Sequence, residues 1–433
     1  MQTSNVSIAN GARSLQSPVH RSPTFQSPAW TERYLVPLIF RRIGPAPLRI
    51  AIGEGQGVSP PGVVPQFRVS VRDAATLFGI LLDPEIGFGD AWTEGRISLQ
   101  GDLLAFLETV YAAMYSAARD KGWLQHLVSR WIAASQSNTP EGSRRNIHSH
   151  YDMGNDFYRL WLDRRMVYTC AYFPEPFATL EEAQQAKLDL VCRKLRLRPG
   201  ETVAEAGCGW GALALHMARH YGVRVKAYNI SREQILYARG QAHEEGIDRQ
   251  VEFIEDDYRN ATGRFDAFVS IGMLEHTDRA NYPQFGSVIH RLIGERGRGL
   301  LHFIGRNEHG EFSRWIRKRI FPGAYAPSLG EALNVLEPFG YFVQDVENLR
   351  PHYARTLEHW LDRFDKSADA VRRMYDARFE RAWRLYLAGS IAGFRAGTLQ
   401  LFQVLFSGAK CTALPPTRRD LYNPAGPHAF PPA

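Results

Sequence analysis

Cysteine is scarce in this 433-residue chain, which contains only four. They are Cys170, Cys192, Cys208 and Cys411. No two of them form a CxxC pair, which argues against a structural zinc site, and their wide scatter argues against a disulfide framework. The sequence therefore fits a reducing compartment, and we expect a cytoplasmic protein.

Long apolar runs are also missing. No stretch approaches the roughly 18 consecutive apolar residues of a membrane-spanning helix. The first 30 residues contain no acidic side chain and no continuous apolar segment of the secretory type, and they are rich in Ser, Pro and Gln. We expect a disordered tail over 1–30 and a Pro-rich C-terminal tail over 413–433.

Apolar and aromatic residues are plentiful, at 44% and 12% of the chain. The length exceeds the roughly 250–300 residues at which single cores stop growing, so we expect more than one domain. The net charge of +7 and the isoelectric point of about 9.2 predict an anionic partner. That partner can be a nucleic acid or the surface of a bilayer.

A polar stretch with Pro and Gly over 135–143 is interpreted as a linker. Before it, residues 31–134 are predicted to form a small α+β module. Short alternating segments occur there at 67–71 and 87–95, and an apolar helical pattern follows at 103–114.

After the linker, residues 144–412 alternate between helical and strand patterns, which is typical of an α/β, Rossmann-like domain with a parallel sheet covered on both faces. Helices are expected at 180–195, 212–221, 231–245 and 379–406, and strands at 203–206, 223–228, 251–254, 265–271 and 300–304. Ligands of such sheets bind at the carboxyl ends of the strands. Glu205, Asp257, Glu275 and Ile304 fall at these ends.

The most informative segment is the loop that follows the strand at 203–206. Gly207, Gly209 and Gly211 alternate there, directly before a predicted helix. Glycines let the backbone approach a ligand closely, and the free N–H groups of the helix attract a polar or anionic group. The loop therefore predicts a nucleotide-like cofactor, with a purely structural turn as the alternative.

The choice of cofactor depends on the neighbouring acids. The spacing of Gly207, Gly209 and Ala212 fits the dinucleotide fingerprint, which requires an acidic residue about 20 positions later. The next strand instead ends at Asn229, with no acid beside it. Glu205 stands two residues before the first glycine, where its carboxylate can face a cationic amine. This arrangement favours S-adenosylmethionine (SAM) over NAD.

Seven segments occur together in a fixed order. They are HSHYDMGND at 148–156, YTCAYF at 168–173, EAGCGWG at 205–211, GMLEH at 272–276, LHFIG at 301–305, FPG at 321–323 and PHYARTL at 351–357. Over residues 144–410 the chain thereby resembles the cyclopropane-fatty-acyl-phospholipid synthases and the related mycolic acid methyltransferases. The resemblance implies a class I SAM-dependent methyltransferase fold. It also implies transfer of a methylene unit to the cis double bond of an unsaturated phospholipid acyl chain.

The same resemblance implies a bound bicarbonate as the base that allows the ring to close. Its ligands map onto Cys170, Glu275, His302, the backbone of Ile304, and Tyr353. His302 and Tyr353 can donate to an anion, and Glu275 can accept the bicarbonate hydroxyl proton. An alkene is a weak nucleophile, so catalysis has to come from positioning and electrostatic stabilisation in a dry cavity.

Each of these side chains also has a structural interpretation. Cys170 can be a small buried hydrophobe and His302 a core histidine. Tyr353 can pack a helix, and Glu275 can cap the helix that follows its strand. The adjacent His276 is interpreted as structural.

The cofactor contacts implied by the resemblance are Tyr168, Thr169, Glu205, Gly207, Gly209, Trp210, Gly211, Asn229, Gln234, Asp257 and Tyr258. Gln234 has an alternative role, because with Ser231 it fits a capping box. Asn229 stands where threonine is usual in the family, and Glu205 where aspartate is commoner. Ser390 stands where many members have a cysteine, which argues against a cysteine nucleophile there. These departures are also compatible with a variant enzyme whose product is an open methyl-branched or methylene acyl chain.

The segment 312–321 has an apolar stripe and a basic remainder. Its stripe contains Phe312, Trp315, Ile316 and Ile320, and its basic residues include Arg314, Arg317 and Lys318. Such a segment can lie in a bilayer interface and attract anionic lipid, or it can be an ordinary packed helix with a solvated basic face.

We expect an unsaturated phospholipid at the inner face of the membrane as substrate, and a homodimer is one assembly to test. A nucleic-acid partner is not expected, because the chain lacks the Asn/Asp-Pro-Pro-Tyr/Phe pattern that grips a flipped base. A catalytically inactive lipid-binding protein is the other alternative, but it would have lost the cofactor loop or the base ligands. Both are present here.

Overall fold

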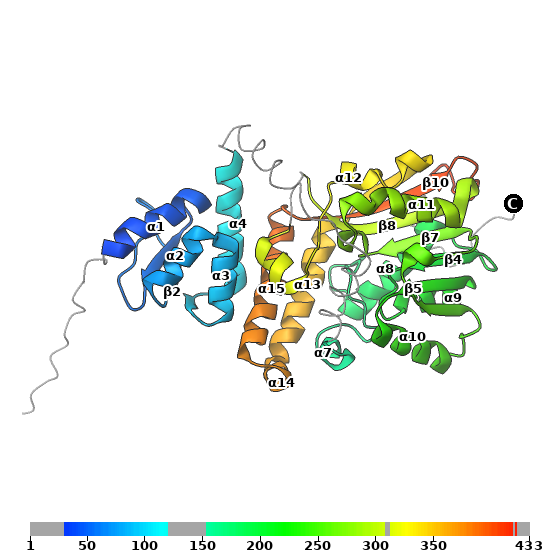
Figure 1. Cartoon of the computed structure of the whole chain (residues 1–433). Coiled ribbons are helices and arrows are strands. Elements are labelled where there is room, and N and C mark those ends of the chain that lie inside the picture. Colours follow the sequence, from blue (N-terminus) through cyan, green and yellow to red (C-terminus); the bar gives the residue numbers. More distant parts are fainter. Residues whose placement is uncertain (1–29, 120–152, 308–311, 419–420, 422–433) are drawn as a thin grey trace, which may run out of the picture.

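The computed structural model describes residues 30–119, 153–307, 312–418 and 421. The tail predicted before Trp30, the linker predicted at 135–143 and most of the 413–433 tail lie outside these residues. Figure 1 shows an N-terminal module, a layer of helices and a domain built on a large sheet, in that order across the molecule. No helix of the described part of the chain is long and apolar enough to span a bilayer.

The N-terminal module is the α+β unit that the sequence predicts. Its elements are α1 (Trp30–Ile43), β1 (Leu48–Ile52), β2 (Phe67–Val71), α2 (Ala74–Leu82), α3 (Pro84–Thr93), β3 (Ile97–Gln100) and α4 (Leu103–Arg119). Strand β2 lies between the others, parallel to β1 and antiparallel to β3. The strand predicted at 67–71 and the helix predicted at 103–114 are confirmed.

The alternating segment at 87–95 forms no strand, because most of it belongs to helix α3. Asp83 caps the start of this helix with its side chain. The glycines of α3 allow close packing, since a Cβ on Gly87 would stand 2.5 Å from the carbonyl oxygen of Gly79 in α2. The alternating small residues of this segment therefore belong to a close contact between two helices and not to a strand.

The second domain is built on a seven-stranded sheet with the order β6-β5-β4-β7-β8-β10-β9. Its strands are β4 (Thr202–Ala206), β5 (Arg224–Asn229), β6 (Val251–Glu255), β7 (Ala267–Ile271), β8 (Arg298–Gly305), β9 (Tyr341–Asn348) and β10 (Gln400–Gly408). The strands from β6 to β8 are parallel, which confirms the α/β fold class. Strand β10 is antiparallel to both of its neighbours, so the expectation of a wholly parallel sheet is wrong at this edge.

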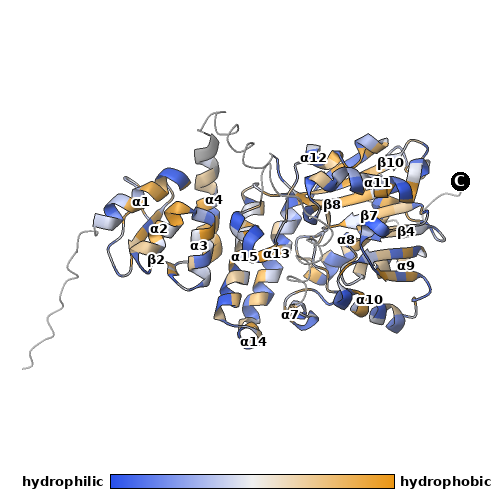
Figure 2. Ribbon diagram, viewed as in Figure 1, coloured by the Kyte–Doolittle hydropathy of each residue, from blue (hydrophilic) through white to orange (hydrophobic). Residues whose placement is uncertain are grey.

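Helices cover both faces of this sheet. One core contains residues of α8 (Leu180–Leu195), α9 (Ala212–Tyr221) and α10 (Arg232–Glu244). The other contains residues of α11 (Tyr282–Ile293) and α12 (Leu329–Leu333). Val203 of β4 belongs to the first core and the adjacent Ala204 to the second. Because both faces are buried, strands such as β7, β8 and β10 are predominantly hydrophobic, as Figure 2 shows.

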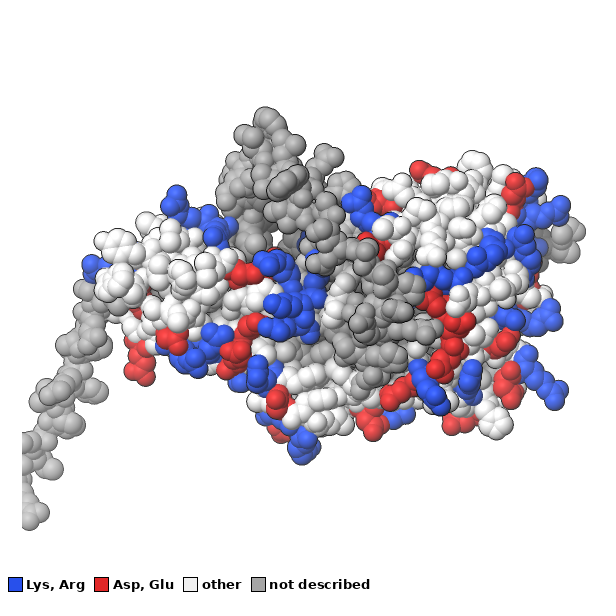
Figure 3. Space-filling view, viewed as in Figure 1, with Lys and Arg blue, Asp and Glu red and all other residues white. Residues whose placement is uncertain are grey.

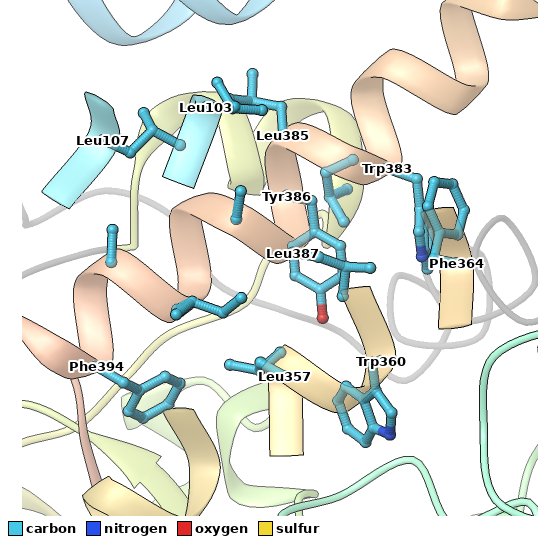
Figure 4. Close-up of a cluster of buried hydrophobic side chains, with 14 of the residues drawn as sticks. Leu103, Leu107, Leu357, Trp360, Phe364, Trp383, Leu385, Tyr386, Leu387 and Phe394 are labelled. Atoms are coloured by element: carbon cyan, nitrogen blue, oxygen red, sulfur yellow. The ribbon is translucent and has the colours of Figure 1, made fainter. Parts of the chain in front are cut away.

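A layer of helices connects the sheet domain to the N-terminal module. It contains α13 (Arg350–Lys366), α14 (Ala368–Met374) and α15 (Ala377–Arg395). Helix α15 contacts α13 on one side and α3 and α4 on the other. Figure 4 shows Leu357 and Trp360 of α13 beside Tyr386 of α15, with Leu103 of α4 beyond them. One continuous apolar core, which also includes Phe157 of the short helix α7 (Asn155–Arg159), joins these parts.

The apolar pattern over 379–406 is helical only in its first part. Helix α15 ends at Arg395, Gly397 has a φ of +79°, and β10 begins at Gln400. Every residue of β10 is buried. A strand buried on both faces lacks the alternation that would distinguish it from a buried helix, which explains the wrong prediction.

Candidate active site

The glycine loop lies between β4 and α9, as predicted. Gly207, Gly209 and Gly211 have positive φ values of +81°, +54° and +85°, which favour glycine. A Cβ on Gly211 would stand 2.7 Å from the Phe253 ring, so this glycine lets the loop pack on the sheet domain. A Cβ on Gly209 would meet no atom within 4 Å, because Gly209 faces a cavity.

This glycine-loop cavity has a volume of about 130 Å³. The predicted cofactor-binding residues that line it are Tyr168, Thr169, Glu205, Gly207, Gly209, Trp210, Asn229 and Gln234. Gly211, Asp257 and Tyr258 do not line it. Asp257 stands after β6 and pairs with Arg259 at 2.8 Å. The strand-end prediction therefore places Glu205, at the end of β4, on this cavity, but it is wrong for Asp257, which follows β6 and does not line the cavity.

Gln234 does not close the predicted capping box. The Ser231 hydroxyl accepts the backbone N–H of Gln234 at 3.5 Å, but the Gln234 side-chain oxygen accepts a hydrogen bond from Asn229 Nδ2 at 2.7 Å. Asn229 Oδ1 accepts the Ser231 N–H at 3.1 Å, and Asn229 Nδ2 also donates to the Gly209 carbonyl at 3.2 Å. Asn229 thus connects the start of α10 to the glycine loop.

Glu205 brings a buried carboxyl group to this cavity. It is 3% exposed, and burial raises its pKa to about 8 although the nearby Lys187 ammonium opposes the rise. Its Oε2 has no hydrogen-bond partner among the described residues. Lys187, whose own pKa burial lowers to about 8, donates from Nζ to Thr169 Oγ1 at 3.0 Å. The buried Glu205 Oε2, which lacks a partner among the described residues, can accept a hydrogen bond from a ligand amine or hydroxyl.

A second cavity, of about 810 Å³, lies between the N-terminal module and the sheet domain and is lined mainly by apolar side chains. We call it the apolar cavity. It shares Tyr168, Thr169, Gly272 and His276 with the glycine-loop cavity, so the two spaces adjoin. At their junction Gly272 has a φ of +68°, and a Cβ on it would stand 3.0 Å from Thr169 Cγ2, which is tighter than an ordinary contact.

Three of the predicted bicarbonate ligands line the apolar cavity: Glu275, Ile304 and Tyr353. Glu275 lies in the 3₁₀ turn Leu274–His276 after β7, and its Oε1 accepts the backbone N–H of Ile304 in β8 at 2.6 Å. The Glu275 side chain therefore accepts a hydrogen bond from the end of strand β8 and does not cap a helix. Burial raises the pKa of Glu275 to about 7, and its Oε2 has no partner among the described residues. Tyr353 comes from α13, with its ring 4.6 Å from that of Phe394.

The other two predicted ligands, Cys170 and His302, line neither cavity. The Cys170 thiol is buried, which raises its pKa, and it donates to the Ala171 carbonyl at 3.1 Å. His302 is 2% exposed, and burial lowers the pKa of its imidazole well below the usual value, so the ring is neutral. Its Nε2 has no hydrogen-bond partner within the described part of the chain.

Residues 138–404 match the family described as mycolic acid cyclopropane synthetase. This match covers more than half of the chain. The chain belongs to this family. A "Probable fatty acid methyltransferase" of Pseudomonas putida is 34% identical over 391 residues, which cover 87% of this chain and 96% of that protein. The cyclopropane-fatty-acyl-phospholipid synthase of Escherichia coli (strain K12) is 40% identical over 259 residues, 60% of this chain and 66% of that protein.

Among solved structures, the mycolic acid cyclopropane synthase CmaA1 complexed with SAH and CTAB aligns with a TM-score of 0.58 and 31% identity. The alignment covers 61% of this chain and 97% of CmaA1. As a member of the cyclopropane synthetase family, this chain is a SAM-dependent methyltransferase with the class I fold. The prediction of SAM as the cofactor is thereby confirmed.

Sequence reasoning missed the two basic residues that line the glycine-loop cavity of this methyltransferase. His276, interpreted as structural, lines both cavities, and burial lowers its pKa to about 4, which keeps it neutral. Lys187 lines the glycine-loop cavity although it stands on the buried face of α8. Lysine is rarely buried without a function or a partner, so its place among the apolar positions of α8 was the available signal.

In the segment 312–321, the stripe residues Trp315 and Ile320 pack against the rest of the molecule, as the packed interpretation expects, whereas Arg314, Lys318 and Arg319 are exposed. Trp315 and Ile320 are each 4% exposed. A Cβ on Gly89 of α3 would stand 2.3 Å from the Trp315 ring, so the two segments are in close contact. The ion pairs that hold the segment on the N-terminal module are Arg314–Asp83 and Arg319–Asp90, each at 2.7 Å.

Proposed function

We propose that this protein transfers a methylene unit from SAM to the cis double bond of an unsaturated acyl chain of a membrane phospholipid, forming a cyclopropane ring with bound bicarbonate as base. The junction of the two cavities is the observation that carries this proposal. A polar cofactor beside the glycine loop can present one group, past Thr169 and Gly272, to an apolar chain in the larger cavity.

The glycine-loop cavity fits SAM. Gly209 leaves open space in front of the loop, and Glu205 Oε2 is a buried acceptor without a partner among the described residues. Gln234 Nε2 is a buried donor that also has no hydrogen-bond partner among the described residues. When bound, SAM supplies an electrophilic methyl group on a sulfonium centre. Glu205 would hold the amine of the cofactor, and Gln234 would donate to its adenosine part.

Glu275, His302 and Tyr353 fit a small anion that carries one hydroxyl group. His302 precedes Ile304 by two residues on β8, so both side chains point to the same face of the sheet. His302 Nε2 can donate to such an anion, and Glu275 Oε2 can accept its hydroxyl proton. Bicarbonate held there would supply a base. Cys170 is the predicted ligand that this geometry supports least, since its thiol bonds Ala171.

The remaining contribution of the chain is to exclude water and to position the alkene. The apolar cavity is lined by side chains such as Phe88, Leu107 and Leu357 from three helices. Charge that develops on the acyl chain is stabilised better by fixed dipoles in such a dry site than by mobile water.

The product distinguishes ring formation from open-chain methylation. Lipids of a bacterial host that expresses the chain should gain one CH₂ per modified acyl chain, and the product should resist mild hydrogenation. Mass spectrometry before and after hydrogenation measures both properties, with a host carrying the empty vector as control. A product that takes up hydrogen, or that contains two more hydrogens than the ring, supports the second candidate, fatty acyl C-methylation. The resemblance to the Pseudomonas putida protein along 87% of this chain favours that candidate.

The membrane contact is proposed on the N-terminal module. Exposed apolar side chains follow one stripe of α1 and continue on α2, which contacts α1. They are Trp30, Tyr34, Leu38, Phe78 and Leu82, exposed by 72%, 71%, 41%, 54% and 70%. Arg33 and Arg41 are exposed on the same helix as the first three. Figure 3 shows a broad uncharged area at this outer end of the molecule, with charged side chains around it. Aromatic and aliphatic side chains beside arginines fit an anionic lipid surface.

Replacing Tyr34 and Leu82 together by Glu should weaken binding to anionic phospholipid vesicles by about 10-fold or more, because each apolar side chain buried in lipid contributes about 1.5–3 kcal/mol. Vesicle sedimentation of the full chain measures this. The matched control is Phe177→Glu, which places the same charge on a side chain that is 95% exposed outside this surface. Equal binding by wild type and the double variant would rule out this surface as the membrane contact.

A further inference from the structure

A row of three polar side chains crosses the strands β8, β10 and β9 at one edge of the large sheet. His302 of β8 lies directly opposite Gln403 of β10, and Gln403 lies opposite Glu347 of β9. Residues directly opposite each other in antiparallel strands point to the same face, so these three side chains form one line. Above the line, Lys194 of α8 donates from Nζ to both Glu347 Oε2 and Gln403 Oε1.

The lysine determines how the Gln403 amide is oriented. An ammonium group has only donors, so the atom of Gln403 that faces Lys194 at 2.7 Å has to be the carbonyl oxygen Oε1. The amide nitrogen Nε2 then points the other way and lies 3.0 Å from His302 Nδ1. Gln403 is 1% exposed and Lys194 is 1% exposed, so water does not compete for these contacts.

The amide orientation in turn determines which nitrogen of His302 carries the proton. Because Gln403 Nε2 can only donate, His302 Nδ1 has to accept, and it carries no proton. The single proton of the neutral ring is therefore on Nε2. That nitrogen is the one with no hydrogen-bond partner among the described residues.

We infer that Gln403, held by Lys194 and Glu347, is a positioning residue that keeps His302 in the Nε2–H tautomer, so that His302 presents a donor and not a lone pair to a bound anion. The inference depends on the proposed function only for the presence of the bound anion. The tautomer itself follows from the contacts of Lys194, Gln403 and His302. The polar row acts as an outer shell that orients a residue closer to the chemistry, as such shells do at metal sites.

The test combines a spectroscopic measurement with turnover. In protein with ¹⁵N-labelled histidine, the His302 signals, identified by their loss in His302→Asn, should show an unprotonated Nδ1 and a protonated Nε2. In Gln403→Glu the carboxylate accepts from Nδ1, so that nitrogen should become protonated. Turnover of SAM on vesicles of unsaturated phospholipid should fall by about 10-fold or more, the scale of outer-shell substitutions, while the affinity for SAM stays unchanged.

Gln344→Glu is the matched control, because it makes the same substitution at an exposed position of β9. Its His302 spectrum and turnover should equal those of wild type. A protonated Nδ1 of His302 in the wild-type protein would by itself overturn the inference. Full turnover by Gln403→Glu with a changed tautomer would also overturn it. Full turnover by His302→Asn would refute the proposed anion site, whereas the tautomer assignment would stand.

Discussion

Glu275→Gln should lower turnover on unsaturated phospholipid by about 100-fold or more, the usual scale for a positioned acid or base. The amide keeps the shape of the side chain and can still accept the Ile304 N–H at 2.6 Å, but it cannot take a proton from a bound anion. His302→Ala should have an effect of similar size, because it removes the Nε2 donor that the proposed anion would use. Calorimetry should give unchanged SAM affinity for both variants.

Glu337→Gln is the control, since this carboxylate is exposed on the 3₁₀ turn Glu337–Phe339. Added bicarbonate should partly restore Tyr353→Phe, which loses one donor and keeps the rest of the site. Wild-type turnover by Glu275→Gln would contradict the proposed chemistry and leave Glu275 as a residue that only secures the end of β8.

The pH dependence follows from the raised pKa of Glu275, which burial brings to about 7. An acceptor has to be ionised, so kcat/KM of the wild-type enzyme should fall as the pH drops below about 7. Glu275→Gln should lack this fall, because its amide does not titrate. A pH profile of both proteins on the same vesicles measures the difference.

Gly209→Val should weaken SAM binding by about 10-fold or more. Gly209 has a φ of +54° and faces the glycine-loop cavity, so a β-branched side chain there is strained by about 1–3 kcal/mol and also fills the space that the cofactor needs. Calorimetry with SAM measures the loss, and NAD should not bind to the wild-type protein.

Gly246→Val is the control that separates backbone strain from obstruction of the cofactor site. Gly246 has a φ of +68° and open space around its Cβ position, but it does not line the glycine-loop cavity. This variant should be less stable and yet bind SAM normally. Normal binding by Gly209→Val would mean that the cofactor site lies elsewhere.

The sequence by itself determined the local features and the family. The alternation of strands and helices predicted β4, α9 and β5 within about one residue at each end, because each element carries its own periodicity and its own turn residues. Gly207 and Gly209 predicted the loop, because the positive φ values that the loop requires favour glycine at those positions. The ordered motifs over 144–410 were sufficient to predict the family that the comparisons confirm.

Only the tertiary structure decided which residues meet across long separations. The stripe of Trp315 fits either a packed or an interfacial helix, and the contact of Trp315 with Gly89 of α3 is one that no local pattern encodes, because the two segments are so distant in the chain. The apolar run of β10 resembles a helix because burial on both faces removes its period. The tautomer of His302 depends on Gln403, which is 101 residues away, and on Lys194 of helix α8. Periodicity determines an element, whereas the partner of a buried polar atom is determined by packing.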